Sequence, residues 1–175
     1  VLVEMTEVIP LAQALATASG SGRPRVAITF DDAYAGALDV GLAELVRRGI
    51  PATVFVSPAL LGTETWWDRM ADPTSGEVIT AIREHCLRDL AGKDAHIIDW
   101  AAKSGMLNNS ALALQRIGSE DQLALAASQP GISFGSHSWS HANLAQLDES
   151  ELARELTRPL EWLQSRFDNV VPWLS

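Results

Sequence analysis

Residues 26–56 read VAITFDDAYAGALDVGLAELVRRGIPATVFV and predict a strand, a helix and a second strand in succession. The first and last five residues of this stretch are β-branched, aromatic and small apolar residues, a composition typical of buried strands. Between them, leucine and valine recur at helical spacing until Gly49 and Pro51 end the helix. Two strands joined by a crossover helix pair in parallel, so the stretch predicts an α/β fold.

Two further strands and a long helix are predicted near the end of the sequence. Residues 132–136 read ISFGS, a short strand candidate. Asp148 and Glu151 form a capping-box pattern that predicts a helix start, and Pro159 predicts a kink or an early break in that helix. Residues 170–174 predict another strand. A parallel sheet with an open edge there predicts self-association unless another segment covers the edge.

The segment between the second and third predicted strands carries little strand signal. Residues 77–90 predict a helix, because apolar side chains share one helical face: Ile79, Ile82, Cys86, Leu87 and Leu90. We therefore predict one domain over residues 1–175 that contains a helical insertion over residues 58–128.

Composition excludes several classes of protein. The 175 residues are 47% hydrophobic, enough for a substantial core, and carry a net charge of −9, which argues against a nucleic-acid partner. The single cysteine, Cys86, excludes an internal disulfide and a multi-cysteine zinc cluster. No run of residues has the length and apolar character of a membrane span, and no signal peptide is visible in this segment. The compartment stays open.

Polar side chains follow two of the predicted strands. Asp31 and Asp32 come directly after the first, where adjacent carboxylates repel each other unless a cation or hydrogen bonds compensate; one of them could instead cap the next helix. His137 and His141 follow the strand of residues 132–136 at a spacing that suits one metal ion, although either histidine alone fits packing or solvent equally well. The carboxyl ends of parallel strands share one edge of a sheet, so the two sites are expected to converge.

One carboxylate and two imidazoles form a hydrolytic metal set, for which zinc fits best. A metal held by Asp32, His137 and His141 would polarise a carbonyl and lower the pKa of a water molecule. Asp31, beside the ligand, would then act as the base that takes the proton of the water.

These residues resemble two motifs of the polysaccharide deacetylases, carbohydrate esterases built on a NodB-like domain. The first motif is present as Thr29-Phe30-Asp31-Asp32-Ala33, and the second is complete as His137-Ser138-Trp139-Ser140-His141. Residues 49–56 also look like the second strand of the family and its approach. The resemblance covers roughly residues 24–57 and 120–175.

The resemblance implies a distorted (β/α) barrel, like a TIM barrel, of which this chain contains the first part. It implies a metal-dependent hydrolase that removes acetyl groups from N-acetylated sugars of a polysaccharide or a peptidoglycan-like glycan. By this resemblance Asp31 would be the base, and Thr29 and Ser138 would support the site. The resemblance also implies the metal ligands Asp32, His137 and His141. Tryptophans near the site either line a sugar subsite or pack within the helical insertion: Trp66, Trp67, Trp100 and Trp139.

The sequence departs from the family pattern in three places. Ala33 replaces a glycine, which would strain the turn if that residue needs a positive φ. The helical insertion is atypical. The arginine and the histidine acid of the later family motifs cannot be assigned here. Two alternatives therefore remain beside the deacetylase, namely a non-catalytic carbohydrate-binding protein and an amidase that acts on a small non-sugar amide.

Overall fold

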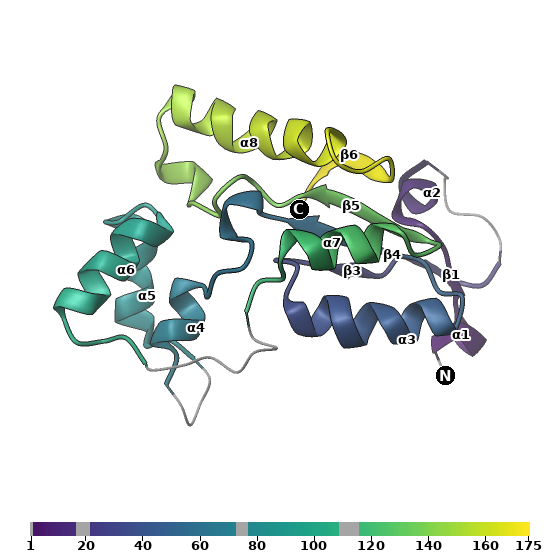
Figure 1. Cartoon of the computed structure of the whole chain (residues 1–175), viewed down its shortest axis with the longest axis horizontal. Coiled ribbons are helices and arrows are strands. Elements are labelled where there is room, and N and C mark those ends of the chain that lie inside the picture. The colour runs from purple at the N-terminus through teal and green to yellow at the C-terminus, as the bar shows by residue number, and fades with distance from the viewer. Residues whose placement is uncertain (1, 17–21, 73–76, 109–115) are drawn as a thin grey trace.

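The computed structural model describes residues 2–16, 22–72, 77–108 and 116–175, and two parallel sheets form its framework (Figure 1). One sheet pairs β1 (Glu7–Val8) with β2 (Arg25–Val26). The other has four strands in the order β3 (Thr29–Phe30), β4 (Ala52–Val56), β5 (Ile132–Ser136) and β6 (Val170–Leu174). The predicted α/β class with parallel strands is confirmed. Within the described residues both sheets are open, and no closed barrel is formed.

The first predicted strand is wrong as a single element, because residues 26–30 divide between the two sheets. The carbonyl of Val26 accepts a hydrogen bond from Ile9 N at 3.0 Å, whereas the carbonyl of Ile28 accepts one from Thr53 N at 3.0 Å. The chain therefore passes from one sheet to the other between these residues, and only Thr29 and Phe30 pair with β4 in regular register.

Helices connect and flank the strands. A π-helical turn (Ala37–Gly41) leads into α3, and short 3-10 helices cover Pro58–Leu60 and Leu144–Gln146. The α-helices are α1 (Leu2–Met5), α2 (Leu11–Ala16), α3 (Leu42–Arg47), α4 (Trp66–Met70), α5 (Thr80–Arg88), α6 (Asp94–Lys103), α7 (Glu120–Ala127) and α8 (Glu149–Gln164). None of the helices within the described ranges combines the length and apolar character needed to cross a bilayer.

One apolar core joins the four-stranded sheet to its connecting helices. The strands follow one another in chain order, so right-handed crossovers place α3, α7 and α8 on the same face of the sheet. Their side chains Leu42, Leu123 and Leu163 accordingly lie in one buried cluster with Val54 and Phe134 of the sheet. This packing fixes the sheet edge at which the predicted site residues lie.

A second buried cluster joins α4, α5 and α6 beside the sheet (Figure 1). It contains Trp66, Met70, Cys86, Ile97 and Ala101. The predicted apolar face of α5 therefore exists around Cys86. Ile79, which was predicted on that face, precedes the helix and is exposed.

Helix α8 begins as predicted and continues past its proline. The Asp148 carboxylate accepts a hydrogen bond from Glu151 N at 2.8 Å, and Glu151 reaches back to Asp148 N, which completes the capping box. The predicted early break at Pro159 is wrong, since the helix runs on to Gln164. Proline removes only one helical hydrogen bond, and the buried ring of Pro159 packs in the interior.

Leu123 of α7 lies in the core that α7 shares with the sheet, so we predict that Leu123→Ala destabilises the protein. Leu123 is fully buried, so we expect the free energy of unfolding to fall by about 2 to 5 kcal/mol. Leu125→Ala, on an exposed side of the same helix, is the matched control and should change it by less than about 0.5 kcal/mol. Urea denaturation of both variants measures the difference, and equal effects would contradict the packing of α7 on the sheet.

Candidate metal centre

Asp32 lies in a strained turn directly after β3. Asp32 and Ala33 adopt left-handed conformations, with φ of 66° and 57°, which cost energy for residues with a Cβ. Two backbone hydrogen bonds hold the turn, from Ala33 N to Asp31 O and from Gly118 N to Ala33 O, both 2.9 Å. The alanine that replaces the family glycine therefore does occupy a position with positive φ, and its side chain is fully buried.

The two histidines lie in the loop that leaves β5. The loop is fixed at its start, where His137 N donates to Val56 O at 2.9 Å and Ser57 Oγ donates to His137 O at 2.5 Å. Ser138 has a φ of 59° and its buried hydroxyl accepts a hydrogen bond from His141 N at 3.0 Å. These contacts turn both rings toward the carboxyl end of β3.

Asp32, His137 and His141 converge. Their possible ligand atoms all lie within 4.8 Å of one another, and Nε2 of each histidine lies 3.5 Å from Asp32 Oδ1. This spacing is long for a hydrogen bond, whereas two ligands of one tetrahedral zinc ion lie roughly 3.4 Å apart. Asp32 Oδ1 is buried and has no hydrogen-bond partner among the described residues, so it lacks the compensation that a buried carboxylate needs. Both observations fit a divalent cation.

Burial also sets the protonation of this cluster. It raises the pKa of Asp32, against the opposing effect of the two histidines, and the nearby Asp31 carboxylate adds to the rise. Burial lowers the pKa of His141, against the opposing effect of Asp32. A neutral imidazole keeps a lone pair free, and this is the form that binds a metal.

Glu155 of α8 supports the histidine loop, and it was not predicted. The side chain is only 8% exposed, and its carboxylate accepts hydrogen bonds from Trp139 N, Ser140 N and Ser140 Oγ at 2.7–2.9 Å. The only sequence signal is an acidic residue among apolar neighbours on the helix face that packs on the sheet. His137 is oriented separately, because its Nδ1 lies 2.8 Å from Ser175 O and leaves Nε2 toward Asp32.

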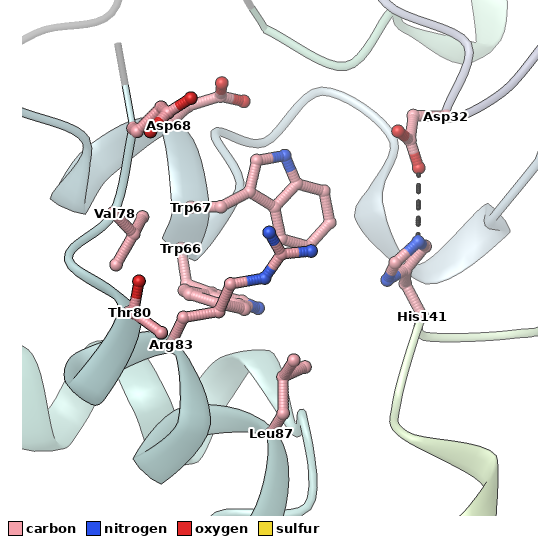
Figure 2. A pocket seen from close by; sticks show the side chains of 10 residues that line it. Asp32, Trp66, Trp67, Asp68, Val78, Thr80, Arg83, Leu87 and His141 are labelled. Carbon is pink, nitrogen blue, oxygen red and sulfur yellow. Dashed lines mark ion pairs between the residues drawn. The ribbon is translucent and has the colours of Figure 1, made fainter. Parts of the chain in front are cut away.

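A cavity of about 500 Å³ opens beside the cluster, between Asp32 and His141 on one side and α4 and α5 on the other (Figure 2). Trp67 belongs to α4 but also contacts the histidine side of the cavity, because its ring centroid lies 4.8 Å from that of His141. Its Nε1 donates to Tyr34 Oη at 2.7 Å, and Tyr34 in turn donates to Asp68 at 2.8 Å. Burial raises the pKa of Tyr34, so the hydroxyl stays protonated in this chain of hydrogen bonds.

The structure separates the other predicted site residues. Trp66 lines the cavity but is only 3% exposed. Trp139 lines a different cavity, where the Arg158 guanidinium lies 3.8 Å above its ring, and Trp100 contacts His85 in the helical cluster. Asp31 is exposed at the turn next to Asp32.

Thr29, the remaining predicted support residue, is exposed on β3 and pairs with Thr53 of β4. The predicted metal ligands are therefore gathered in one place. Of the predicted aromatic residues, Trp66 and Trp67 line the cavity beside the cluster, whereas Trp100 and Trp139 lie elsewhere.

Two solved structures share this fold. The Streptococcus pyogenes deacetylase PplD, in complex with acetate, matches with a TM-score of 0.57 at 16% identity, over 97% of this chain and 54% of PplD. The BpsB deacetylase domain from Bordetella bronchiseptica matches with a TM-score of 0.54 at 15% identity, over 98% of this chain and 63% of that domain. The chain thus spans a little over half the length of these structures.

The sequence matches one protein family over most of its length, whereas a comparison with individual curated proteins finds no match. Residues 18–175, which include both strained loops and the three residues that could hold a metal, match the family described as Polysaccharide deacetylase. The chain belongs to the polysaccharide deacetylase family.

Proposed function

We propose that this chain is the metal-binding part of a hydrolase that removes acetyl groups from N-acetylated sugars of a polysaccharide or a peptidoglycan-like glycan. The observation that carries the proposal is the convergence of Asp32, His137 and His141 around a buried, unpartnered carboxylate oxygen. These residues would hold the metal, and zinc suits one carboxylate and two imidazoles best. Family membership supports a hydrolase that acts on carbon–nitrogen bonds.

The proposed chemistry divides between the metal and the chain. The metal, when bound, polarises the acetamide carbonyl and makes a water molecule more acidic. Asp31 is the base that accepts the proton of the attacking water, since it lies next to a ligand and is exposed. The amide C–N bond breaks, acetate leaves, and the sugar nitrogen is released as an amine that has gained a proton. We assign no residue of this chain as the donor of that proton.

The cavity supports a sugar as the substrate. The rim of the cavity is aromatic where Trp67 meets His141, and the face of an aromatic ring is a good surface for a pyranose ring. Trp66, which packs edge-to-face against Trp67 at 5.5 Å, would hold that ring in place from behind. We therefore assign Trp67 to substrate binding and Trp66 to positioning it.

The architecture supports assignment as one part of a larger family domain. The chain order of the four parallel strands, with their helices on one face, is the arrangement of a (β/α) barrel segment. We infer a distorted barrel for the whole domain. Of the predicted insertion over residues 58–128, α7 belongs to the barrel segment, and the part before it, which contains α4, α5 and α6, is the insertion. The open edge of β6 would then be covered by further strands or by a second copy of the chain.

Removing one ligand should abolish tight zinc binding. We expect His141→Ala to weaken zinc binding by more than the roughly 10- to 100-fold loss that is typical of a supporting residue. His96→Ala, which removes an exposed histidine outside the cluster, should leave the affinity unchanged. Competition with a zinc-binding dye measures both variants, and equal affinities would disprove the cluster as the metal site.

Asp31→Asn separates the base from the ligands. The amide cannot accept the proton, so we expect kcat for acetate release from N-acetylated chitooligosaccharide to fall at least about 100-fold. Zinc affinity should change little, because Asp31 is not one of the ligands. Loss of metal together with activity would contradict the role of base. Sugar binding without acetate release by the unsubstituted protein would favour a carbohydrate-binding protein.

Glu155→Gln tests the support of the histidine loop. The glutamine keeps the shape of the side chain but removes its charge. The bonds from Trp139 N and Ser140 N to one oxygen lose their charge assistance, and the third bond has to reverse so that the amide donates to Ser140 Oγ. We expect zinc binding to weaken about 10- to 100-fold while circular dichroism stays unchanged. Glu161→Gln, exposed on the same helix, is the control. An affinity equal to that of the control would show that the loop holds its shape without Glu155.

A further inference from the structure

The cavity beside the metal-ligand cluster contains an arginine. Arg83 lies on α5 and lines the cavity together with Trp67, Asp32 and His141. Figure 2 shows its side chain extending from α5 past Trp66, toward the side where Asp32 and His141 lie. Arg83 is the only lysine or arginine among the described residues that line this cavity.

Arg83 has no ionic partner in the described part of the chain. No carboxylate there lies within ion-pair distance of its guanidinium, and residues 1, 17–21, 73–76 and 109–115 include no aspartate or glutamate. Three acids also line the cavity, namely Asp32, Asp68 and Glu77. Asp32 belongs to the metal-ligand cluster, and Asp68 accepts hydrogen bonds from Tyr34 Oη at 2.8 Å and Thr65 Oγ1 at 2.5 Å.

Several other arginines have carboxylate partners, whereas Arg88 and Arg154, which lie outside this cavity, likewise have no ion pair among the described residues. Arg47 and Arg48 bind Glu44, and Arg166 binds Glu120. The chain has 22 acidic residues, but Arg83 faces the cavity and pairs with none of the described ones. Its guanidinium can therefore bind a group that occupies the cavity.

We propose that Arg83 selects an acidic substrate, an acylated glycan that carries an oxyanion, either carboxylate or phosphate, close to the acetylated sugar. This inference rests on the proposed deacetylation and adds to it the charge of the substrate. A planar guanidinium binds both oxyanions through two parallel hydrogen bonds. The cavity of about 500 Å³ is much larger than an acetamide group, so it has room for a neighbouring charged group.

Three N-acetylated oligosaccharides of equal length, one neutral, one with a carboxylate and one with a phosphate, test this selection. In the unsubstituted protein we expect kcat/KM for at least one acidic substrate to exceed that for the neutral one roughly five- to tenfold at low salt, and the excess to shrink as salt screens the exposed charge. The better of the two acidic substrates identifies the oxyanion. Arg83→Gln should remove the excess, so that kcat/KM for the acidic and the neutral substrates becomes equal.

Two further variants separate the site from the overall charge of the protein. Arg88→Gln removes the same charge from the same helix, but outside the cavity, and should retain the preference. Arg83→Lys keeps the charge without the planar group and should retain only part of it. An equal loss in Arg83→Gln and Arg88→Gln, or no preference for an acidic substrate in the unsubstituted protein, would overturn the proposal.

Binding measured without turnover keeps the two proposals distinguishable. Calorimetric titration of the zinc-loaded protein with the amine products should show the same preference for the acidic glycan, again lost in Arg83→Gln. A preserved binding preference without acetate release would support Arg83 as the anion site and contradict the hydrolase. Acetate release with equal affinity for neutral and acidic sugars would support the hydrolase and contradict Arg83 as the anion site.

Discussion

The buried oxygen of the Asp32 carboxylate is the point on which the site depends. It faces two imidazole nitrogens at 3.5 Å, too far for a good hydrogen bond and close to the spacing of two ligands around one cation. A carboxylate in this position costs free energy unless a positive charge neutralises it. The surrounding structure holds the three side chains in this arrangement, with strained backbone on both sides of the cluster.

Both loops of the site keep residues with side chains in left-handed conformations. Asp32 and Ala33 do so after β3, and Ser138 and His141 do so after β5. Such conformations persist where the surroundings fix them, and here they are fixed by Gly118, by the Ser138 hydroxyl and by the Glu155 carboxylate. Glu155 lies on α8 and Gly118 directly precedes α7, and both helices pack on the sheet, so the packing of the core and the geometry of the cluster are linked.

The sequence was sufficient to predict the elements whose signals are local. The strands at residues 52–56 and 132–136 and the capping box at Asp148 depend on neighbouring residues, and they appear as predicted. The convergence of Asp32, His137 and His141 could be predicted because each motif marks the end of a strand.

The missed features depend on contacts between distant residues. Residues 26–30 divide between two sheets because Ile9 N bonds the carbonyl of Val26, whereas Thr53 N bonds the carbonyl of Ile28. Glu155 binds the histidine loop from 15 residues away, and no pattern in the sequence marks that pairing. Helix α8 tolerates Pro159 because of the burial of its ring, which the local sequence does not reveal.

Tyr34 gives the helical cluster a direct mechanical connection to the metal centre. It lies two residues after Asp32, accepts a hydrogen bond from Trp67 of α4, and is held from behind by an isolated bridge to Ile117. The turn that orients the Asp32 carboxylate and the wall of the cavity therefore share one chain of hydrogen bonds, from Trp67 through Tyr34 to Asp68. Tyr34 belongs at once to the backbone that carries the carboxylate and to the packing of α4.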